Sequence, residues 1–437
     1  MVFCFALYGM NGFAEPDRPD YAKRIPPGKL KEDLDFLFKT IEEVHPNMYA
    51  YTSKEKFEAS RYKLYNQITR PMTRLNFLKL VAPTIALLKS NHTVVFLPLP
   101  PAPSELTDFI QKGGKFFPLS IDWYEEKVIL SENYTSEKLP LGGTILQIND
   151  EEISTVIKQL ERYYSAEGKD TCPAALEKDK AIRVLFWLEY GPIEALKLRI
   201  KSIDGTINDY IVEMMTFDQL KAKEDTNKGI NSYRYQTEYD TFYLKLDDWA
   251  CWSRIKEFTE FCDEVFKKIQ EKRASHLIID LRNNPGGDLF NTEIFTTYLI
   301  KNPNLSFQGA VSLKKLKPFY RENNPLRFEG SVYLFMDEIS MSASTLFAGI
   351  IKNHRSATIV GQEPIEPLTF YGSTTNFKLP NTGLLLNVPQ AKFVVPGSKN
   401  DGRGIIPDYE VKQTPEDTAK AVDTVLQFTL NLIKDSD

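Results

Sequence analysis

Three serines stand at alternate positions in the segment MDEISMSASTLFAGII, which covers residues 336–351. An apolar strand ends near Asp337, and a helix must begin within the serine run. Serine is a good helix N-cap, so capping accounts for one of the three hydroxyls. A serine at this place can also be a nucleophile, because the amides of a first helical turn can hold an oxyanion. The turn from strand to helix would expose its hydroxyl, as in other serine hydrolases.

The loop RNNPGGD, residues 282–288, is the second segment that could take part in chemistry. Two consecutive glycines after Pro285 allow the backbone to approach a ligand closely, with amides free to donate. Most Pro-Gly-Gly sequences are only tight turns. A donor loop beside a helix that begins with serines nevertheless fits an oxyanion hole.

The elements around both segments predict an α/β domain over residues 230–437. Continuous apolar strands at HLIIDL (276–281) and VYLFMD (332–337) alternate with amphipathic helices. Strands without polar alternation indicate a mainly parallel sheet covered by helices on both faces. Sites in such sheets lie at the carboxyl ends of the strands, which is where both loops begin.

Two further regions precede this domain. Residues 26–100 have helical periodicity, for example at Leu34, Leu37 and Ile41, and predict a helical N-terminal domain. Residues 115–216 read as a β-rich module with an Asp-Gly turn at residues 204–205. Its segment GGTILQINDEEI is similar to part of a PDZ domain, although an unrelated β module remains an alternative.

The first 14 residues are mostly apolar and match the core of a signal peptide, so we expect an exported protein of the periplasm or cell envelope. A disordered or packed N-terminus is the alternative. The composition, 42% hydrophobic and 26% charged with a net charge of -5, is that of a globular protein and indicates no nucleic-acid partner. The four cysteines and four histidines are scattered, and no later segment is apolar enough to span a membrane. We therefore expect neither a metal nor a cofactor.

The stretches IIDLRNNPGGDLFNTEIF and SVYLFMDEISMSASTLFAGIIKNHRSATIVGQEP resemble the C-terminal processing (tail-specific) serine peptidase family. That family also includes the tricorn protease core and the interphotoreceptor retinoid-binding protein repeats. Its layout of a helical region, a PDZ-like module and an α/β catalytic domain is similar to the one predicted here. The resemblance implies Ser342 as nucleophile, with oxyanion donors at Gly286 or Gly287 and at Ala343.

The resemblance does not by itself identify the general base, because the branches of the family use different residues. The tail-specific branch uses a glycine-flanked lysine about 25 residues after the serine, but Pro367 stands there, and Lys378 and Lys352 are poor substitutes. The tricorn-like branch uses a histidine in a motif similar to LLKSNHTVVFLP, which implies His92. Imidazole suits proton transfer near neutral pH.

An acid should orient the imidazole. The resemblance places this acid at Asp401 in SKNDGRGIIPDYEV, where a plain Asp-Gly turn explains the residue equally well; Glu363 is the competing acid. The sequence thus predicts a serine peptidase acting on polypeptides. A ligand-binding protein on the same scaffold and an esterase-like acyl hydrolase are the alternatives, because fold alone does not fix function.

Overall fold

The computed structural model describes residues 21–168, 176, 181–223, 232–236, 239–249, 255–301, 324–395 and 402–435 of the 437-residue chain. The chain forms two compact units. The first consists of Met1–Lys223 and Tyr371–Lys392, and the second of Glu224–Phe370 and Phe393–Asp437. The predicted leader, residues 1–14, lies outside the described residues. Within them, no helix is both long and apolar enough to cross a bilayer.

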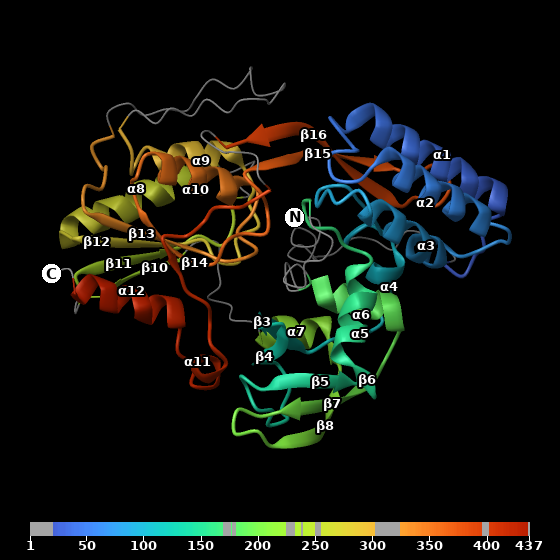
Figure 1. Ribbon diagram of the computed structural model, residues 1–437, viewed down its shortest axis with the longest axis horizontal. Helices are drawn as coiled ribbons and strands as arrows, with labels where there is room; N and C mark the ends of the chain where they lie inside the picture. Colours follow the sequence, from blue (N-terminus) through green and yellow to red (C-terminus); the bar gives the residue numbers. More distant parts are fainter. Residues whose placement is uncertain are drawn as a thin grey trace. The chain divides into compact units, whose positions relative to one another are not determined.

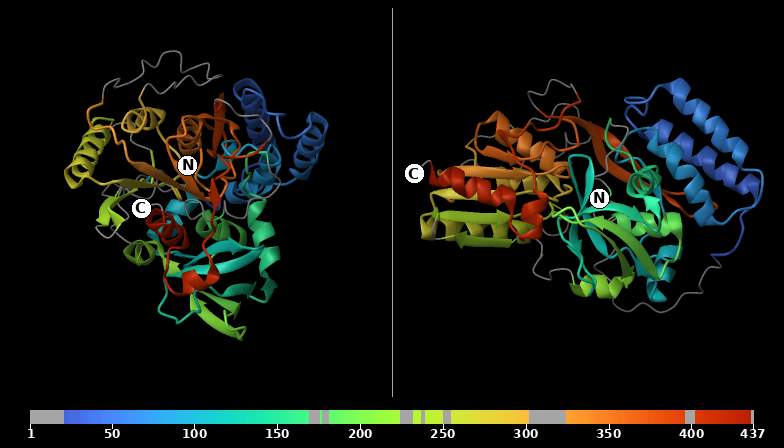
Figure 2. Two further views of the ribbon diagram at one scale, coloured as in Figure 1. Left: turned by 60° about the vertical axis from the view of Figure 1, so that its left-hand side comes forward. Right: turned by 60° about the horizontal axis from the view of Figure 1, so that its bottom comes forward.

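The first unit opens with a helical bundle. Helix α1 buries the face that its spacing predicts, including Leu34, Leu37 and Ile41. Ser53 caps α2 and Thr73 caps α3 with their side-chain oxygens. The three helices, drawn in blue, lie side by side in both views of Figure 2. The helices of this unit are α1 (Pro27–Val44), α2 (Lys54–Gln67), α3 (Arg74–Ala86), α4 (Glu105–Gln111), α5 (Ile153–Glu161), α6 (Ala181–Tyr190) and α7 (Phe217–Lys223).

The β-rich part of this unit is an antiparallel sheet of order β3-β4-β5-β7-β8, with β6 paired to β5. The predicted Asp-Gly turn joins β7 to β8, and Gly205 takes a positive φ of 89° there. The PDZ-like assignment stays a prediction. The strands are β1 (Val94–Phe96), β2 (Lys115–Phe116), β3 (Leu119–Tyr124), β4 (Lys127–Asn133), β5 (Thr144–Ile148), β6 (Glu151–Glu152), β7 (Ala195–Lys201), β8 (Ile207–Glu213) and β9 (Met215–Thr216).

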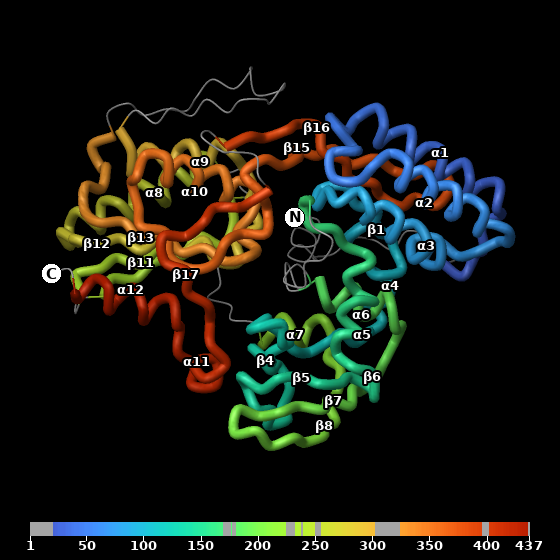
Figure 3. The backbone as a smooth tube through the Cα atoms, in the orientation of Figure 1, coloured from blue at the N-terminus to red at the C-terminus, as the bar shows by residue number. Residues whose placement is uncertain are grey.

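A long hairpin late in the chain was not predicted. Strands β15 (Thr369–Lys378) and β16 (Leu385–Val394) run alongside each other in Figure 3, and β16 pairs antiparallel with β1. Most of this hairpin, Tyr371–Lys392, belongs to the first unit, although the sequence suggested one continuous domain over residues 230–437. The three-domain division itself stays a prediction.

The second unit is built on a six-stranded sheet of order β10-β11-β12-β13-β14-β17. Only the β10–β11 pair is antiparallel among the pairs described. The strands are β10 (Ser232–Gln236), β11 (Thr241–Lys245), β12 (His276–Asp280), β13 (Ser331–Met336), β14 (Thr358–Gly361) and β17 (Tyr409–Glu410). The helices are α8 (Ile255–Lys272), α9 (Leu289–Thr296), α10 (Ala343–Asn353), α11 (Pro415–Ala419) and α12 (Thr424–Lys434).

Helices cover both faces of this sheet. Leu277 and Ile279 of β12 pack in one cluster with residues of α8, α9 and α10, whereas Ile278 packs in another cluster with residues of α12. Figure 1 shows the same layers. This arrangement explains the continuous apolar strands, because each residue of a doubly covered strand is buried whichever way it points. The unit is therefore a mixed α/β fold, as the sequence predicts.

Candidate active site

The glycine loop (residues 282–288) and the serine turn (residues 337–342) leave the same edge of the sheet. Strands β12 and β13 are parallel neighbours, with Asp280 in register with Phe335. Each strand ends at this edge, and its connection to the next helix starts there. The shared edge follows from parallel pairing, and it brings segments about 55 residues apart in sequence into contact.

Ser342 occupies the N-cap position directly before α10, but its side chain does not cap the helix. A helix N-cap normally has an extended backbone and accepts a hydrogen bond from the first turn. Ser342 has φ 56° and ψ -115°, and its side chain makes no cap hydrogen bond. It is partly exposed, whereas its neighbours Met341 and Ala343 are buried. The capping interpretation therefore fails for this residue, and its strained backbone is typical of a functional site.

The two flanking serines have structural roles. The hydroxyl of Ser340 lies 2.8 Å from both the Leu281 carbonyl and the Asp337 carboxylate, and its one proton is within reach of either acceptor. Ser344 accepts the indole N–H of Trp249 at 2.9 Å. Both serines are fully buried. Within the described part of the chain, the hydroxyl of Ser342 is the one of the three that has no hydrogen-bond partner.

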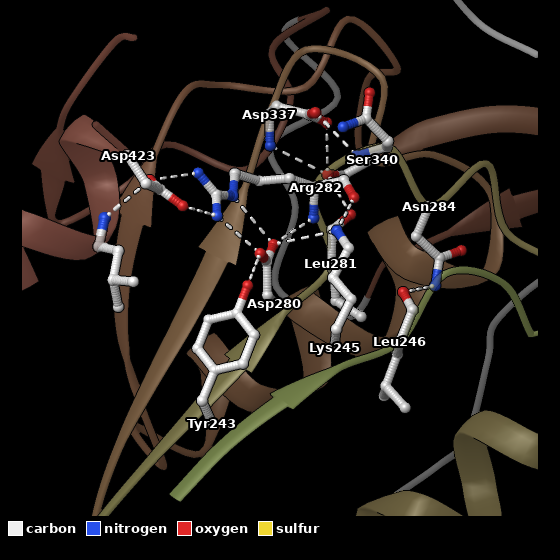
Figure 4. A network of polar contacts seen from close by, with 12 residues as sticks. Tyr243, Lys245, Leu246, Asp280, Leu281, Arg282, Asn284, Asp337, Ser340 and Asp423 are labelled. Carbon is white, nitrogen blue, oxygen red and sulfur yellow. Dashed lines mark hydrogen bonds and ion pairs between the residues drawn. The ribbon is translucent and has the colours of Figure 1, made fainter. Parts of the chain in front are cut away.

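Asn284 fixes the glycine loop against the serine turn. Its side chain accepts the N–H of Gly286 at 2.9 Å and donates to the Leu246 carbonyl at 2.9 Å, as Figure 4 shows for the second bond. Its carbonyl accepts the N–H of Met341 at 3.1 Å. One buried asparagine thus connects the glycine loop, the residue that follows β11 and the turn before the serine.

Gly286 lies directly against Ser342. Its φ is 102°, and a Cβ added to it would stand 2.6 Å from the Cβ of Ser342. Because the N–H of Gly286 already donates to Asn284, it is less suited to hold an oxyanion than the sequence suggested. The N–H groups of Gly287 and Ala343 have no acceptor among the described residues, and they are the donors that the geometry favours.

Glu366 is a site residue that the sequence analysis missed. It is fully buried, and its carboxylate accepts the backbone N–H of Ser342. It stands 24 positions after the serine, close to where the tail-specific branch has its lysine, and that spacing was the available signal. The competing acid Glu363 instead forms an ion pair with Arg403 and accepts the N–H of Gly404 at 2.7 Å. Asp401 lies outside the described residues.

His92 is in the first unit, in the turn that precedes β1. Its side chain is buried, and its carbonyl accepts the side-chain amide of Asn387 at 3.0 Å. The preceding N–H, of Asn91, donates to the buried carboxylate of Glu167 at 2.9 Å. Ser342 belongs to the second unit, so the pairing of the two side chains stays a prediction.

A second buried histidine, His45, is a poor candidate for the base. Burial lowers its pKa to about 4, so that it would bind a proton only weakly near neutral pH. Its Nε2 lies 3.3 Å from the hydroxyl of buried Ser90, which is a structural contact.

An ionic network supports the root of the glycine loop (Figure 4). The guanidinium of Arg282 pairs with Asp280 at the end of β12 and, through two bonds of 2.8 and 2.7 Å, with Asp423 before α12. Burial alone would raise the pKa of Asp280, but the charges of Arg282 and Lys245 outweigh it and hold this pKa well below its usual range. The buried charge of Asp280 is therefore stabilised by the two cations, and the network depends on both of them.

Replacing Arg282 by methionine is expected to lower the free energy of unfolding by about 3 kcal/mol or more, because buried Asp280 then keeps Lys245 but loses the cation that pairs with it most closely. Arg403→Met removes the ion pair with Glu363, in which Arg403 is 60% exposed, and should cost less than about 1 kcal/mol. Denaturant titrations of both variants provide the comparison. Equal losses would contradict the assigned role of the buried network.

Comparison with known proteins shows which families and folds this chain resembles. Residues 240–411 match the model of peptidase family S41. A carboxy-terminal-processing protease of Bartonella bacilliformis is 28% identical over 236 residues, covering 51% of this chain and 49% of that protein. A carboxyl-terminal-processing protease of Picosynechococcus sp. is 24% identical over 320 residues, covering 69% of this chain and 72% of that protein.

The solved structure of mature CPAF has a similar fold, with a TM-score of 0.66 at 14% identity, and the match covers 94% of this chain and 98% of that one. The chain spans about half the length of the first curated relatives that it matches. In its fold and in the matched segment, the chain is similar to C-terminal processing peptidases. The sequence similarity to peptidase family S41 lies in residues 240–411.

Proposed function

We propose that the protein is a serine peptidase in which Ser342 is the nucleophile. The observation that carries this proposal is the state of Ser342 itself. It has a strained backbone at the start of a helix, a hydroxyl that caps nothing, and a glycine loop packed directly against it. A packing role needs none of these features, and each of them suits a reactive hydroxyl.

In the proposed reaction the hydroxyl oxygen of Ser342 attacks the carbonyl carbon of the scissile peptide bond, and His92 takes the hydroxyl proton. The amides of Gly287 and Ala343 donate to the oxyanion that forms. His92 then returns the proton to the leaving amine, and water releases the acyl group by the same steps. Asp401 is the proposed partner that orients His92.

Polypeptides with exposed C-terminal ends are the proposed substrates. The β-rich module, residues 115–216, offers antiparallel strands to which an extended peptide can add as a further strand. The bacterial relatives named as C-terminal processing proteases support this choice. We also infer an exported protein, because the first 14 residues match the core of a signal peptide.

A fluorophosphonate probe tests the proposal, because it reacts with activated serine hydroxyls. We expect one label per chain, mapped to Ser342 by peptide mass spectrometry, together with cleavage of an unfolded polypeptide. His92→Gln should slow labelling at least about 100-fold, since general-base catalysis contributes on the order of 100- to 10,000-fold. His354→Gln, at the far end of α10, is the matched control and should label normally.

Labelling at a different residue would overturn the nucleophile, and unchanged labelling of His92→Gln would overturn the base. A protein that is labelled at Ser342 and cleaves esters but no polypeptide would contradict the peptidase assignment.

A further inference from the structure

The side chain of Glu366 contacts the backbone of Ser342, the proposed nucleophile, and makes no bond to the hydroxyl of Ser342. The buried carboxylate accepts the N–H of Ser342, and the carbonyl of Ser342 accepts the N–H of Leu346 at 3.1 Å. Both polar backbone groups of the nucleophile are therefore engaged. One bond belongs to the helix that begins there, and the other comes from a side chain 24 residues away.

The conformation of Ser342 needs such support. A non-glycine residue with φ near 56° and ψ near -115° lies outside the regions that side chains favour, so it persists only where its surroundings hold it. The glycine loop limits Ser342 on one side through the close approach of Gly286. The side chain of Glu366 supplies the second constraint, because one of its oxygens accepts the N–H of Ser342.

The segment that carries Glu366 is itself fixed. The N–H of Ile365 donates to the carbonyl of Glu338 at 2.8 Å, and the N–H of Leu368 donates to the carbonyl of Arg403 at 2.9 Å. Pro367 restricts the backbone of Glu366 to extended conformations, because its ring would clash with a helical one. The carboxylate is thus presented from a backbone with little freedom.

We propose that Glu366 is a positioning residue for the reaction: its hydrogen bond to the N–H of Ser342 holds the nucleophile in the conformation that presents the hydroxyl. The inference rests on the proposed function. It also gives a role to Glu366, which stands near the position where the tail-specific branch carries its lysine. A carboxylate accepts hydrogen bonds and holds the serine backbone there, and the proton of the hydroxyl goes to another residue.

Two conservative variants separate the reach of this side chain from its charge. Glu366→Asp keeps the charge but is one methylene shorter, so it should lose the bond. Glu366→Gln keeps the length and a carbonyl oxygen that can accept from Ser342. Glu410→Asp and Glu410→Gln, at an exposed glutamate of β17 in the same unit, are the matched controls.

The measurements are the rate of fluorophosphonate labelling, kcat and KM on a peptide, and the circular dichroism spectrum. We expect Glu366→Asp to lower the labelling rate and kcat about 10- to 100-fold with KM within twofold, because a small displacement of a reacting group has effects of this size. Glu366→Gln should stay within about threefold of the wild type, and the Glu410 variants should not differ from it.

Three outcomes would overturn the inference. Wild-type rates in Glu366→Asp would show that the bond is not needed. Equal losses in Glu366→Gln and Glu366→Asp would show that the charge acts and the bond does not. Unfolding of Glu366→Asp would show a role in folding instead of placement. Each of these counts against Glu366 alone as long as Ser342→Ala abolishes labelling; persistent labelling of Ser342→Ala would reject the proposed function as well.

Discussion

Replacing Ser342 by alanine is expected to reduce peptide cleavage to background, a loss on the order of 10,000-fold or more in kcat, and to abolish fluorophosphonate labelling. The variant should fold normally. The hydroxyl makes no hydrogen bond to the described part of the chain, so that its removal leaves no buried group unpaired there. The backbone strain at this position is also no worse for alanine than for serine.

The neighbouring serines provide matched controls for this prediction. Ser340→Ala and Ser344→Ala each remove a buried, hydrogen-bonded hydroxyl, and each should cost about 1–3 kcal/mol of stability. Both variants should still be labelled at Ser342. Labelling that persists in Ser342→Ala, or that disappears in a folded Ser340→Ala protein, would refute the assignment. Labelling and thermal unfolding of the three purified variants decide the matter.

Replacing Gly286 by alanine is expected to lower kcat about 100- to 1000-fold, the size of effect seen when an oxyanion donor is lost. The added Cβ would lie 2.6 Å from the Cβ of Ser342 and 2.9 Å from the nitrogen of Ala343. Real atoms do not approach so closely, so the glycine loop must move away and take the amide of Gly287 with it. The positive φ of 102° adds backbone strain to the clash.

Gly205→Ala separates the clash from the backbone strain. Gly205 has a φ of 89° in an exposed turn, and a Cβ there would meet no atom within 4 Å. This variant should lose about 1 kcal/mol of stability and keep its kcat. Steady-state kinetics of both variants test the difference. Similar kcat values for Gly286→Ala and the wild type would mean that the loop does not serve the reaction.

The sequence by itself determined the local framework of the site. Residues 276–281 and 332–337 are continuous apolar runs, and such runs form the doubly covered strands β12 and β13 observed here. The loops that follow begin at one sheet edge because neighbouring parallel strands end together. The spacing of apolar side chains likewise predicted the buried face of α1 and the helical part of residues 343–353.

The unit to which the hairpin of β15 and β16 belongs could not be predicted from the spacing of apolar residues. No local sequence pattern in β15 and β16 predicts which of the two units they join. Most of the hairpin belongs to the first unit, where β16 pairs with β1. Pairing between strands that lie some 290 residues apart depends on the whole fold, and a propensity argument does not contain it.

Tertiary structure alone also decided the details on which the proposed chemistry depends. Ser342 takes a positive φ, the Gly286 amide is occupied by Asn284, and the N–H of Ser342 donates to Glu366, which lies 24 residues further along the chain. A strained backbone persists only when distant groups hold it, so no local pattern can reveal it. The sequence therefore determined which serine stands at the start of the helix, and the packing of the glycine loop and of the Glu366 side chain around Ser342 determined how its hydroxyl is presented.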